Sequence, residues 1–418
     1  PMMPTKYEFR VKKSAYKVYK DIETLLKNND YDFIINACDA GMEGENIFYS
    51  FYKKAKCTLP VKRFWTSQTT DSAIRHALEH LIDENDEMIR NLRNAAMYRM
   101  IFDWLVGLNL TRAATVKGGR TIKVGRVMTP TLAIVVKCEL EIRHFVPTPY
   151  FQLELDFGQF KALWFDPVAK TNKLESLQAA QRIQAKLTPT AHVNQIETER
   201  KTIYAPSLHS LLELQKEANK FYGFTSAETL KIAQSLYEKK LITYPRTESK
   251  HLPTAFATTI ASNIQAAATL PQFEQIANHI LNNGTHIQKI AHSKRYVDDK
   301  KLTDHHAITI TDIPVGRKSL TPGESKIYDL IVKRLLAIFL PPYVLDKTNV
   351  IVMCGGEHFK ASGNIVVDKG YTILYESQKR KEEQPLPPLQ EGQQLTVYHN
   401  QILSKMTEPP ARYTDSTL

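Results

Sequence analysis

The sequence predicts a multidomain protein that combines an α/β unit, a mostly α segment and β-rich regions. At about 150 residues per domain, its 418 residues suggest two to four folded units. Near the start, residues 31–56 read as a buried strand, an acidic turn and a helix, the order typical of an α/β sheet. Strand-like patterns also lie on both sides of a block at 207–310, which suggests one domain inserted into another.

Composition narrows the class of protein. Apolar residues make up 43% and charged residues 24%, which is globular usage and excludes a disordered chain. Lys and Arg number 55 against 44 Asp and Glu, and the resulting net charge of +11 favours a polyanionic partner, nucleic acid first. Four separated cysteines form no CxxC pair, which excludes a disulfide framework and a zinc site and indicates a reducing compartment. No apolar run approaches 18 residues, so we expect no membrane span.

The acidic turn is the first candidate site. Asp39 and Glu43 stand between the end of the predicted strand and the start of the helix, so their carboxylates should converge. Mg²⁺ prefers such oxygen ligands and takes one or two carboxylates. Glu45 lies further into the helix and could face elsewhere. The alternative is that acidic residues simply favour helix N-termini.

Further along the chain, the pattern changes from helical to extended and back. Thr225 and Glu228 fit a capping box, and the following helix has a predicted buried stripe of Ala227, Leu230, Ala233 and Leu236. Gly355-Gly356 reads as a hairpin turn. The predicted segments are helices at 70–82, 88–110 and 207–240, strands at 150–165 and 349–367, and an exposed loop at 377–388.

A Tyr-Pro-Arg sequence follows the capped helix. Pro245 keeps the backbone of Tyr244 out of the helical region, so the phenol is presented from a rigid, non-helical segment. Arg246 can reach a phosphate that the phenol contacts and bind it as a bidentate cation. A phenol with a pKa of about 10 is a poor nucleophile unless cations stabilise the developing charge. The alternative is a packed aromatic ring beside a surface arginine.

Two other groups could contact phosphate. Neighbouring residues on a strand point oppositely, so His305 and His306, which follow Asp304, could not easily bind one ion. One histidine could instead donate a hydrogen bond or carry a proton. Arg120 and Arg126 each follow glycines that let the backbone approach a phosphate. A polar loop and a solvated basic loop are the respective alternatives.

Together these segments resemble the type IA DNA topoisomerases, most closely their topoisomerase III branch. The resemblance covers essentially the whole chain. The LITYPRTES sequence in its context is its most specific part. The matching motifs are NACDAGMEGENIF at 36–48, VGRVMTPTL at 124–132, LQKEANKFYGFTSAETLKIAQSLYEKKLITYPRTES at 214–249, DHHAI at 304–308 and PPARYT at 409–414.

The resemblance implies an enzyme that cleaves single-stranded DNA transiently and without ATP. The family's tyrosine forms a 5′-phosphotyrosine with a free 3′-hydroxyl, and strand passage and religation then relax negative supercoils or decatenate DNA. Mg²⁺ is needed chiefly for rejoining. The implied site comprises catalytic Tyr244, Arg246 and His305, metal ligands Asp39 and Glu43, and DNA-binding Arg126, Arg120 and Thr247.

The resemblance also implies an architecture, namely a partial TOPRIM (Rossmann-like) domain with a toroidal core. On that scheme we expect a partial TOPRIM domain at 1–98, a helical domain at 99–147, a β arch at 148–204, an inserted tyrosine domain at 205–310, the second half of the arch at 311–398 and a returning helical segment at 399–418. The family's first TOPRIM strand, which carries a glutamate and a lysine, would precede residue 1. We therefore expect an internal fragment of a longer protein, and the fragment by itself could be inactive.

Alternative functions follow from departures from the family pattern. Met42 and Met128 stand where the family has Arg and Gln, which favours a catalytically weakened or inactive single-strand DNA-binding relative as the alternative. A TOPRIM nuclease or primase is a third class, but it needs no tyrosine domain. We expect DNA as the main partner, a helicase as a further candidate, no membrane, a monomer, and a bacterial or archaeal cytoplasmic location with the nucleoid or a plasmid.

Overall fold

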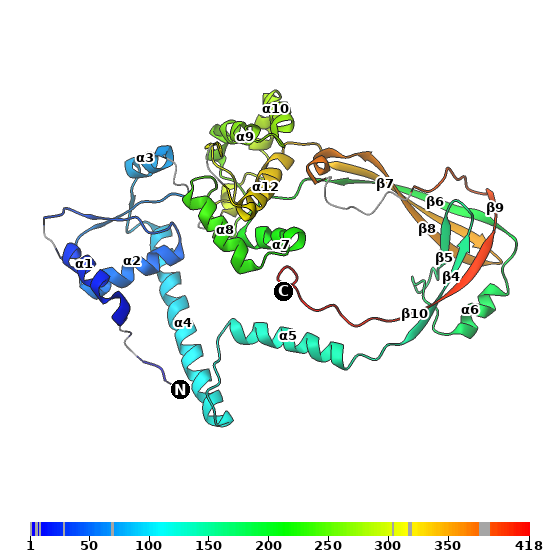
Figure 1. Cartoon of the computed structure of the whole chain (residues 1–418), viewed down its shortest axis with the longest axis horizontal. Helices are drawn as coiled ribbons and strands as arrows, with labels where there is room; N and C mark the ends of the chain where they lie inside the picture. Colours follow the sequence, from blue (N-terminus) through cyan, green and yellow to red (C-terminus); the bar gives the residue numbers. More distant parts are fainter. Residues whose placement is uncertain are drawn as a thin grey trace. The chain divides into compact units, whose positions relative to one another are not determined.

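The chain forms two compact units in the computed structural model. Unit 1 comprises Pro1–Val136, Ser207–Leu336 and Tyr413–Leu418, and unit 2 comprises Lys137–Pro206 and Ala337–Arg412. The structure describes residues 2–4, 7, 10–27, 30–67, 71–302, 305–316, 320–375 and 385–418. Within these ranges every helix is too short or too polar to cross a membrane. Figure 1 shows the elements in chain order.

A three-stranded sheet with flanking helices begins unit 1. Its strand order is β1-β2-β3, with β1 parallel to β2 and β2 antiparallel to β3. The predicted strand, acidic turn and helix at 31–56 are confirmed as β1, the turn and α2. The elements are α1 (Tyr16–Leu26), β1 (Ile34–Asn36), α2 (Met42–Ala55), β2 (Val61–Arg63), α3 (Asp71–Glu79) and β3 (Ile82–Asp83).

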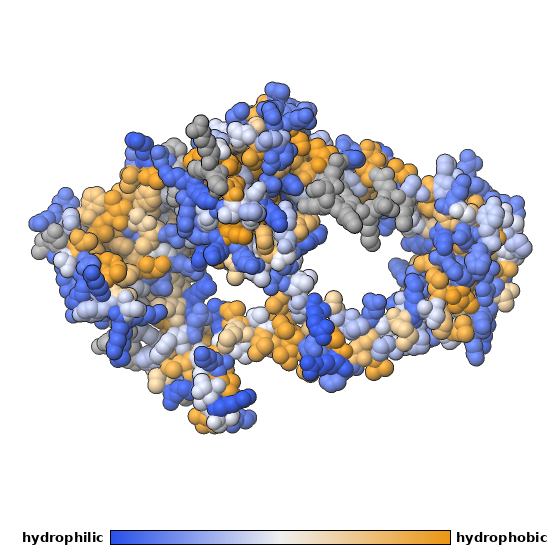
Figure 2. Space-filling model, viewed as in Figure 1, coloured by the Kyte–Doolittle hydropathy of each residue, from blue (hydrophilic) through white to orange (hydrophobic). Residues whose placement is uncertain are grey.

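Two long helices follow the sheet. Helix α4 (Glu87–Gly118) is 32 residues long and starts at Asp86, whose side chain accepts a hydrogen bond from the backbone N–H of Met88. The domain boundary expected at residue 98 falls inside this helix and stays a prediction. Helix α5 (Met128–Arg143) exposes apolar side chains, visible as a hydrophobic surface in Figure 2. In unit 1 these are Met128, Leu132, Ile134, Val135 and Val136.

The part of unit 1 that carries Tyr244 is helical. Helix α7 ends at Gly223, whose φ of +70° favours glycine, and the capping box of Thr225 and Glu228 that starts α8 is confirmed. The predicted stripe of α8 is partly corrected, because Ala227 is exposed and Thr229 is buried in its place. The helices are α7 (Leu211–Tyr222), α8 (Ser226–Glu238), α9 (Ile260–Ala268), α10 (Glu274–Leu281), α11 (Gly284–Ala291) and α12 (Pro322–Ala337).

Unit 2 is built on one antiparallel sheet of seven strands. The strand order is β10-β4-β5-β8-β7-β6-β9, and Figure 1 shows the long strands β6, β7 and β8 side by side. The predicted hairpin turn at Gly355-Gly356 joins β7 to β8, and both glycines have positive φ. The elements are β4 (Pro149–Asp156), β5 (Lys161–Trp164), α6 (Leu177–Gln184), β6 (Thr190–Ile203), β7 (Tyr343–Cys354), β8 (Glu357–Asp368), β9 (Gln394–Thr396) and β10 (His399–Met406).

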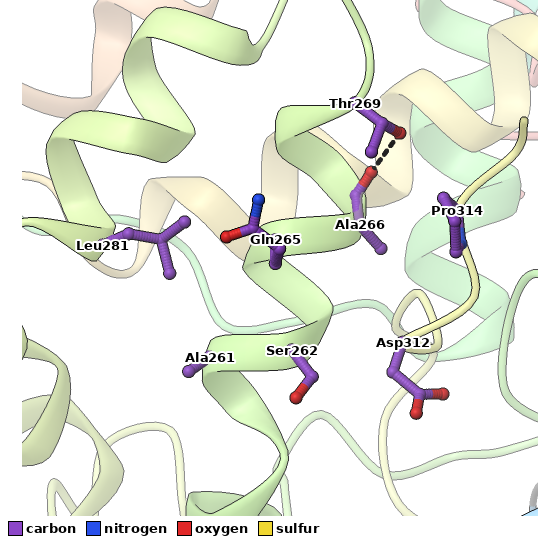
Figure 3. Close-up of a pocket in the computed structure, with 8 residues that line it drawn as sticks. All are labelled: Ala261, Ser262, Gln265, Ala266, Thr269, Leu281, Asp312 and Pro314. Atoms are coloured by element: carbon purple, nitrogen blue, oxygen red, sulfur yellow. Dashed lines mark hydrogen bonds between the residues drawn. The ribbon is translucent and has the colours of Figure 1, made fainter.

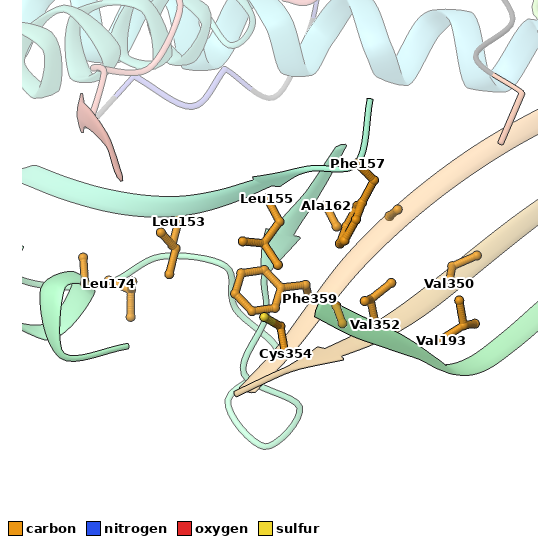
Figure 4. Close-up of a cluster of buried hydrophobic side chains, with 13 residues drawn as sticks. Leu153, Leu155, Phe157, Ala162, Leu174, Val193, Val350, Val352, Cys354 and Phe359 are labelled. Carbon is orange, nitrogen blue, oxygen red and sulfur yellow. The ribbon is translucent and has the colours of Figure 1, made fainter. Parts of the chain in front are cut away.

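One face of this sheet carries the core of unit 2. Leu153 and Leu155 of β4, Val350 and Val352 of β7 and Phe359 of β8 are all fully buried, as expected for alternate residues of a strand. Figure 4 shows their side chains gathered together.

Two expectations about the chain's division are corrected. Residues 399–406 form β10, which pairs with β4 along its whole length, so this segment belongs to the sheet and not to a helical domain. Almost all of α12 belongs to unit 1, whereas we expected it in the β arch. Of the loop expected at 377–388, residues 377–384 lie outside the described residues. The remaining boundaries stay predictions.

Candidate active site

The acidic loop is shaped by glycines at the start of α2. Gly41 has a φ of +151°, which a residue with a side chain rarely adopts. At Gly44, an added Cβ would lie 1.9 Å from the carbonyl oxygen of Asp39. The first turn of α2 therefore packs directly against the backbone of Asp39, which fixes where the Asp39 side chain begins.

Arg63, at the end of β2, holds the other side of this loop and was not predicted. Only 1% of it is exposed, and its Nη1 donates to the carbonyl oxygens of Asn36 at 2.9 Å and Cys38 at 2.7 Å. Its Nη2 donates to the carbonyl oxygen of Asp39 at 2.6 Å. No motif around Arg63 signalled this role, because the partners are backbone oxygens from a distant part of the chain.

Glu45 is the partner of Arg63 and faces away from the acidic pair. Its Oε1 lies 2.7 Å from the Nε of Arg63, and the residue is fully buried. Burial raises the pKa of Glu45, which the positive charge of Arg63 opposes, and burial lowers the pKa of Arg63. The prediction that Glu45 could face elsewhere is confirmed.

Tyr244 enters the same site from the segment after α8. Its backbone N–H donates to the carbonyl oxygen of Ser67 at 3.0 Å, and the preceding Thr243 donates to the carbonyl oxygen of Thr309 at 2.9 Å. Only 7% of Tyr244 is exposed. Its hydroxyl donates to Oδ2 of Asp39 at 2.8 Å. Two predicted site residues, 205 positions apart in the sequence, are thus in direct contact.

The surroundings of the phenol keep it protonated. Burial raises the pKa of Tyr244, the hydrogen bond to Asp39 raises it further, and nearby Arg246 opposes the shift. The ring of Tyr237 packs edge-on at 5.3 Å between centroids, and the ring of His305 lies at 4.5 Å. Tyr244 is therefore a neutral phenol at neutral pH.

His305 is a buried, neutral ring beside the phenol. Burial lowers the pKa of His305 to about 3, with smaller contributions from His306 and Arg63. Its Nδ1 lies 2.8 Å from Oγ of Ser67. His306 points elsewhere, since its Nδ1 donates to the carbonyl oxygen of Ala307. The structure thus separates the two rings, as expected, whereas Asp304 lies outside the described residues.

Arg246 and Glu43 form the open side of the site. Nη1 of Arg246 lies 3.7 Å from Oε2 of Glu43, and their side chains are 49% and 67% exposed. An exposed ion pair at this distance is weak, so both groups remain available to a ligand. Thr247 is buried, and its hydroxyl donates to the carbonyl oxygen of His305 at 3.1 Å, which holds the His305 backbone in place.

Arg120 and Arg126 do not join these residues. Arg126 forms an ion pair with Asp103 on α4. Arg120 follows Gly119, the residue that ends α4, and is exposed. Neither lines the pocket around Tyr244, whereas Arg99 of α4, which was not predicted, does. The DNA-binding roles of Arg120, Arg126 and Thr247 stay predictions.

The site residues line one pocket of about 340 Å³. The ionisable side chains that line it are those of Asp39, Glu43, Arg99, Tyr244, Arg246, Glu248 and His305, and Thr247 lines it too. A second pocket, of about 440 Å³, lies between α9, α10 and residues 312–314 (Figure 3). Small side chains such as Ala261 and Ser262 line it, with Asp312 as its one ionisable group. The smaller pocket is therefore the candidate active site.

The acidic pair fits a magnesium ion better than a transition metal. In the described part of the chain, no group of three or more His, Cys, Asp and Glu side chains could hold a metal ion. Asp39 and Glu43 offer only oxygen atoms, and both line the open pocket. Mg²⁺ is commonly bound by one or two carboxylates and completed by water and phosphate oxygens, so the donor set fits it.

Comparisons with known proteins identify the family. The family model described as DNA topoisomerase matches residues 87–418. The chain is 36% identical to DNA topoisomerase 3 of Bacillus subtilis over 435 residues and of Bacillus licheniformis over 430 residues, covering all of this chain and 58% and 57% of theirs. The chain thus spans less than two thirds of the length of these relatives.

The fold comparison agrees with the sequence comparison. Full-length topoisomerase I from Thermotoga maritima matches with a TM-score of 0.74 and 25% identity, over 98% of this chain and 65% of that one. The expected fold class, which combines α/β, α and β parts in a type IA core, is confirmed by this match. The chain therefore belongs to the type IA DNA topoisomerases and resembles their topoisomerase III branch.

Proposed function

We propose that the protein containing this chain is a type IA DNA topoisomerase that cleaves and rejoins single-stranded DNA through Tyr244. Between cleavage and rejoining, another strand passes, which relaxes negative supercoils or separates linked DNA. The observation that supports this best is the hydrogen bond from the Tyr244 hydroxyl to Asp39 at 2.8 Å, inside the pocket lined by Glu43, Arg246 and His305. A nucleophile, a proton acceptor and a cation are thereby within one small volume.

Cleavage forms one bond and breaks one. The phenol oxygen of Tyr244 attacks the phosphorus, the bond from phosphorus to the 3′ oxygen breaks, and the products are a 5′-phosphotyrosine and a 3′-hydroxyl. Oδ2 of Asp39 accepts the phenol hydrogen bond and so stands ready to take its proton. The 3′ oxygen takes up one proton as it leaves, from protonated Asp39 or from water, which balances the proton that the phenol lost. Rejoining reverses these steps, and because the phosphotyrosine conserves the phosphodiester energy, no ATP is needed.

Two groups stabilise the charge that builds up on phosphorus. The guanidinium of Arg246 is half-exposed in the pocket and can bind the phosphate oxygens in a bidentate manner. His305 is neutral, so it acts as an N–H donor and not as a fixed cation. Fixed donors in a partly buried pocket stabilise such charge more strongly than water does.

Magnesium would be held by Asp39 and Glu43, where it would supply positive charge beside the phosphate and help to orient the DNA ends for rejoining. This proposal rests on the donor set of the acidic loop and is tested by replacing Glu43 with Gln. The variant should rejoin DNA poorly at low Mg²⁺ and recover as Mg²⁺ rises. Unchanged Mg²⁺ dependence would count against Glu43 as a ligand.

The remaining proposals concern partners and location. Arg120, Arg126 and Thr247 would contact the DNA backbone. A helicase that supplies single strands is the candidate protein partner, and a monomer is the proposed state. The named relatives are from Bacillus species, which favours a bacterial cytoplasm, with DNA of the nucleoid or a plasmid as the substrate.

The test uses the full-length protein with single-stranded DNA labelled at its 3′ end, because that label stays with the strand joined to tyrosine. A denaturing gel should show a labelled covalent adduct that Tyr244→Phe abolishes. The matched control is Tyr237→Phe, whose ring packs on Tyr244, and it should keep the adduct. DNA binding without any adduct, with and without Mg²⁺, would favour a non-catalytic single-strand DNA-binding protein.

A further inference from the structure

Ser67 links the nucleophile to the buried histidine. It follows β2 in the segment that leads from Arg63 to α3. Its carbonyl oxygen accepts the backbone N–H of Tyr244 at 3.0 Å, and its Oγ lies 2.8 Å from Nδ1 of His305. One residue thus touches two site residues that come from two other segments of the chain.

The hydroxyl contact bears on which nitrogen of His305 carries the proton. A neutral imidazole has one N–H donor and one acceptor nitrogen, and the partner of one nitrogen fixes the role of the other. If the Ser67 hydroxyl donates to Nδ1, the proton stays on Nε2. The ring then has its single N–H free for an oxygen atom in the pocket that His305 lines.

The backbone of His305 is held independently of Ser67. Thr247 donates its hydroxyl to the carbonyl oxygen of His305 at 3.1 Å, and nearby Ala307 donates its N–H to the carbonyl oxygen of His251 at 2.9 Å. Removal of the Ser67 hydroxyl should therefore release the ring of His305 without unfolding the loop that carries it. The backbone bond from Tyr244 to Ser67 would also survive, because it uses the Ser67 carbonyl.

We propose that Ser67 is a positioning residue of the cleavage reaction, whose hydroxyl donates to Nδ1 of His305 and so keeps its Nε2–H directed to the phosphate. The inference rests on the proposed function for its effect on catalysis, but the tautomer of His305 can be tested without any reaction. Because Ser67 belongs to the segment after β2 and its partners to the tyrosine part, the bond forms only when these parts of unit 1 are together.

The kinetic test compares three variants in the full-length protein. Ser67→Ala should form the covalent adduct roughly tenfold more slowly, the factor for one lost hydrogen bond that acts in the transition state. Ser67→Thr keeps a hydroxyl and should restore the rate to within about threefold. Ser50→Ala is the matched control, since the Ser50 hydroxyl donates within its own helix, to the carbonyl oxygen of Asn46, and this variant should match the wild type. Equal rates for Ser67→Ala and wild type would overturn the role of the hydroxyl.

The spectroscopic test uses ¹⁵N-labelled histidine in the same protein at neutral pH. The wild type should show His305 with its proton on Nε2, and Ser67→Ala should shift the tautomer population. A wild-type proton on Nδ1, or an unchanged tautomer in Ser67→Ala, would overturn the inference. If the wild type forms no adduct at all, the proposed function fails, whereas these spectra still decide whether Ser67 sets the tautomer.

Discussion

Replacing Arg63 with leucine should destabilise the acidic loop more than any single change in the pocket itself. Arg63 is 1% exposed, and it donates to Glu45 and to backbone carbonyl oxygens that include that of Asp39. Leucine fills part of the space but leaves the Glu45 carboxylate buried without its counter-charge. Asn36 would still donate to Oε1 of Glu45 at 3.3 Å, but Oε2 has no hydrogen-bond partner among the described residues, so most of the compensation for the carboxylate charge would be lost.

The expected loss in free energy of unfolding is about 3–5 kcal/mol, the range for removal of one partner of a buried ion pair. The double variant Arg63→Leu/Glu45→Leu removes both charges, so it should recover about 2 kcal/mol or more of that loss. Adduct formation by Tyr244 should also slow in Arg63→Leu, because the backbone of Asp39 loses its anchor. Lys62→Leu is the control, since the ion pair of Lys62 with Asp83 is exposed, and the unfolding midpoint of this variant should stay near the wild type.

The assay is urea unfolding followed by tryptophan fluorescence in a Trp164→Phe background. The other two tryptophans, Trp65 and Trp104, belong to unit 1, so the signal then reports that unit. The reasoning is refuted if Arg63→Leu loses less than about 1 kcal/mol. It is also refuted if the double variant is as unstable as Arg63→Leu, because the unpaired charge of Glu45 would then not be the cause.

Three further predictions concern pH, a helix cap and the core of unit 2. In the folded protein the pKa of His305 is about 3, against 6.5 for the free side chain. Protonation of the unfolded chain therefore lowers the free energy of unfolding below pH 6.5, by about 1.4 kcal/mol per pH unit. Urea unfolding between pH 7.5 and 5 should therefore lose stability less steeply in His305→Gln, and parallel curves would contradict this. Thr225→Ala removes the capping box of α8 and should cost about 1 kcal/mol, whereas Thr225→Ser should cost little in the same assay. Phe359→Ala removes a fully buried ring and should lower the free energy of unfolding of unit 2 by about 3–5 kcal/mol, measured by Trp164 fluorescence. Val168→Ala, at an exposed position, should leave it unchanged.

Local patterns in the sequence predicted much of the secondary structure. The capping box at Thr225, the break at Gly223 and the hairpin at Gly355-Gly356 depend on residues that are close in the chain, so their side-chain chemistry is readable directly. The stripe of α8 was read less well. The helical periodicity that buries Ala233 and Leu236 was predicted correctly. Thr229 is buried in place of Ala227, because the packing partner, and not the helix period alone, sets the edge of a buried face.

Pairing between distant segments was not readable in the same way. The sequence of β10 gives no sign of which strand it pairs with. It nevertheless pairs residue by residue with β4, about 250 positions earlier in the chain. The boundary expected at residue 98 falls within α4, where the sequence pattern gives no sign of a boundary, because a single helix can serve two parts of a protein without any change in its pattern.

The amino-acid order alone singled out Tyr244, Asp39 and Glu43 as candidate site residues, because the tyrosine segment and the acidic turn each have a specific local form. The folded arrangement was needed to show that the Tyr244 hydroxyl bonds to Asp39 and that Glu43 and Arg246 line one pocket. It was also needed to show that Arg63 binds the backbone of Asp39 and that Ser67 contacts Tyr244 and His305. Hydrogen bonds to backbone carbonyls and to buried ring nitrogens form between distant segments, so they leave no periodic pattern in the amino-acid order.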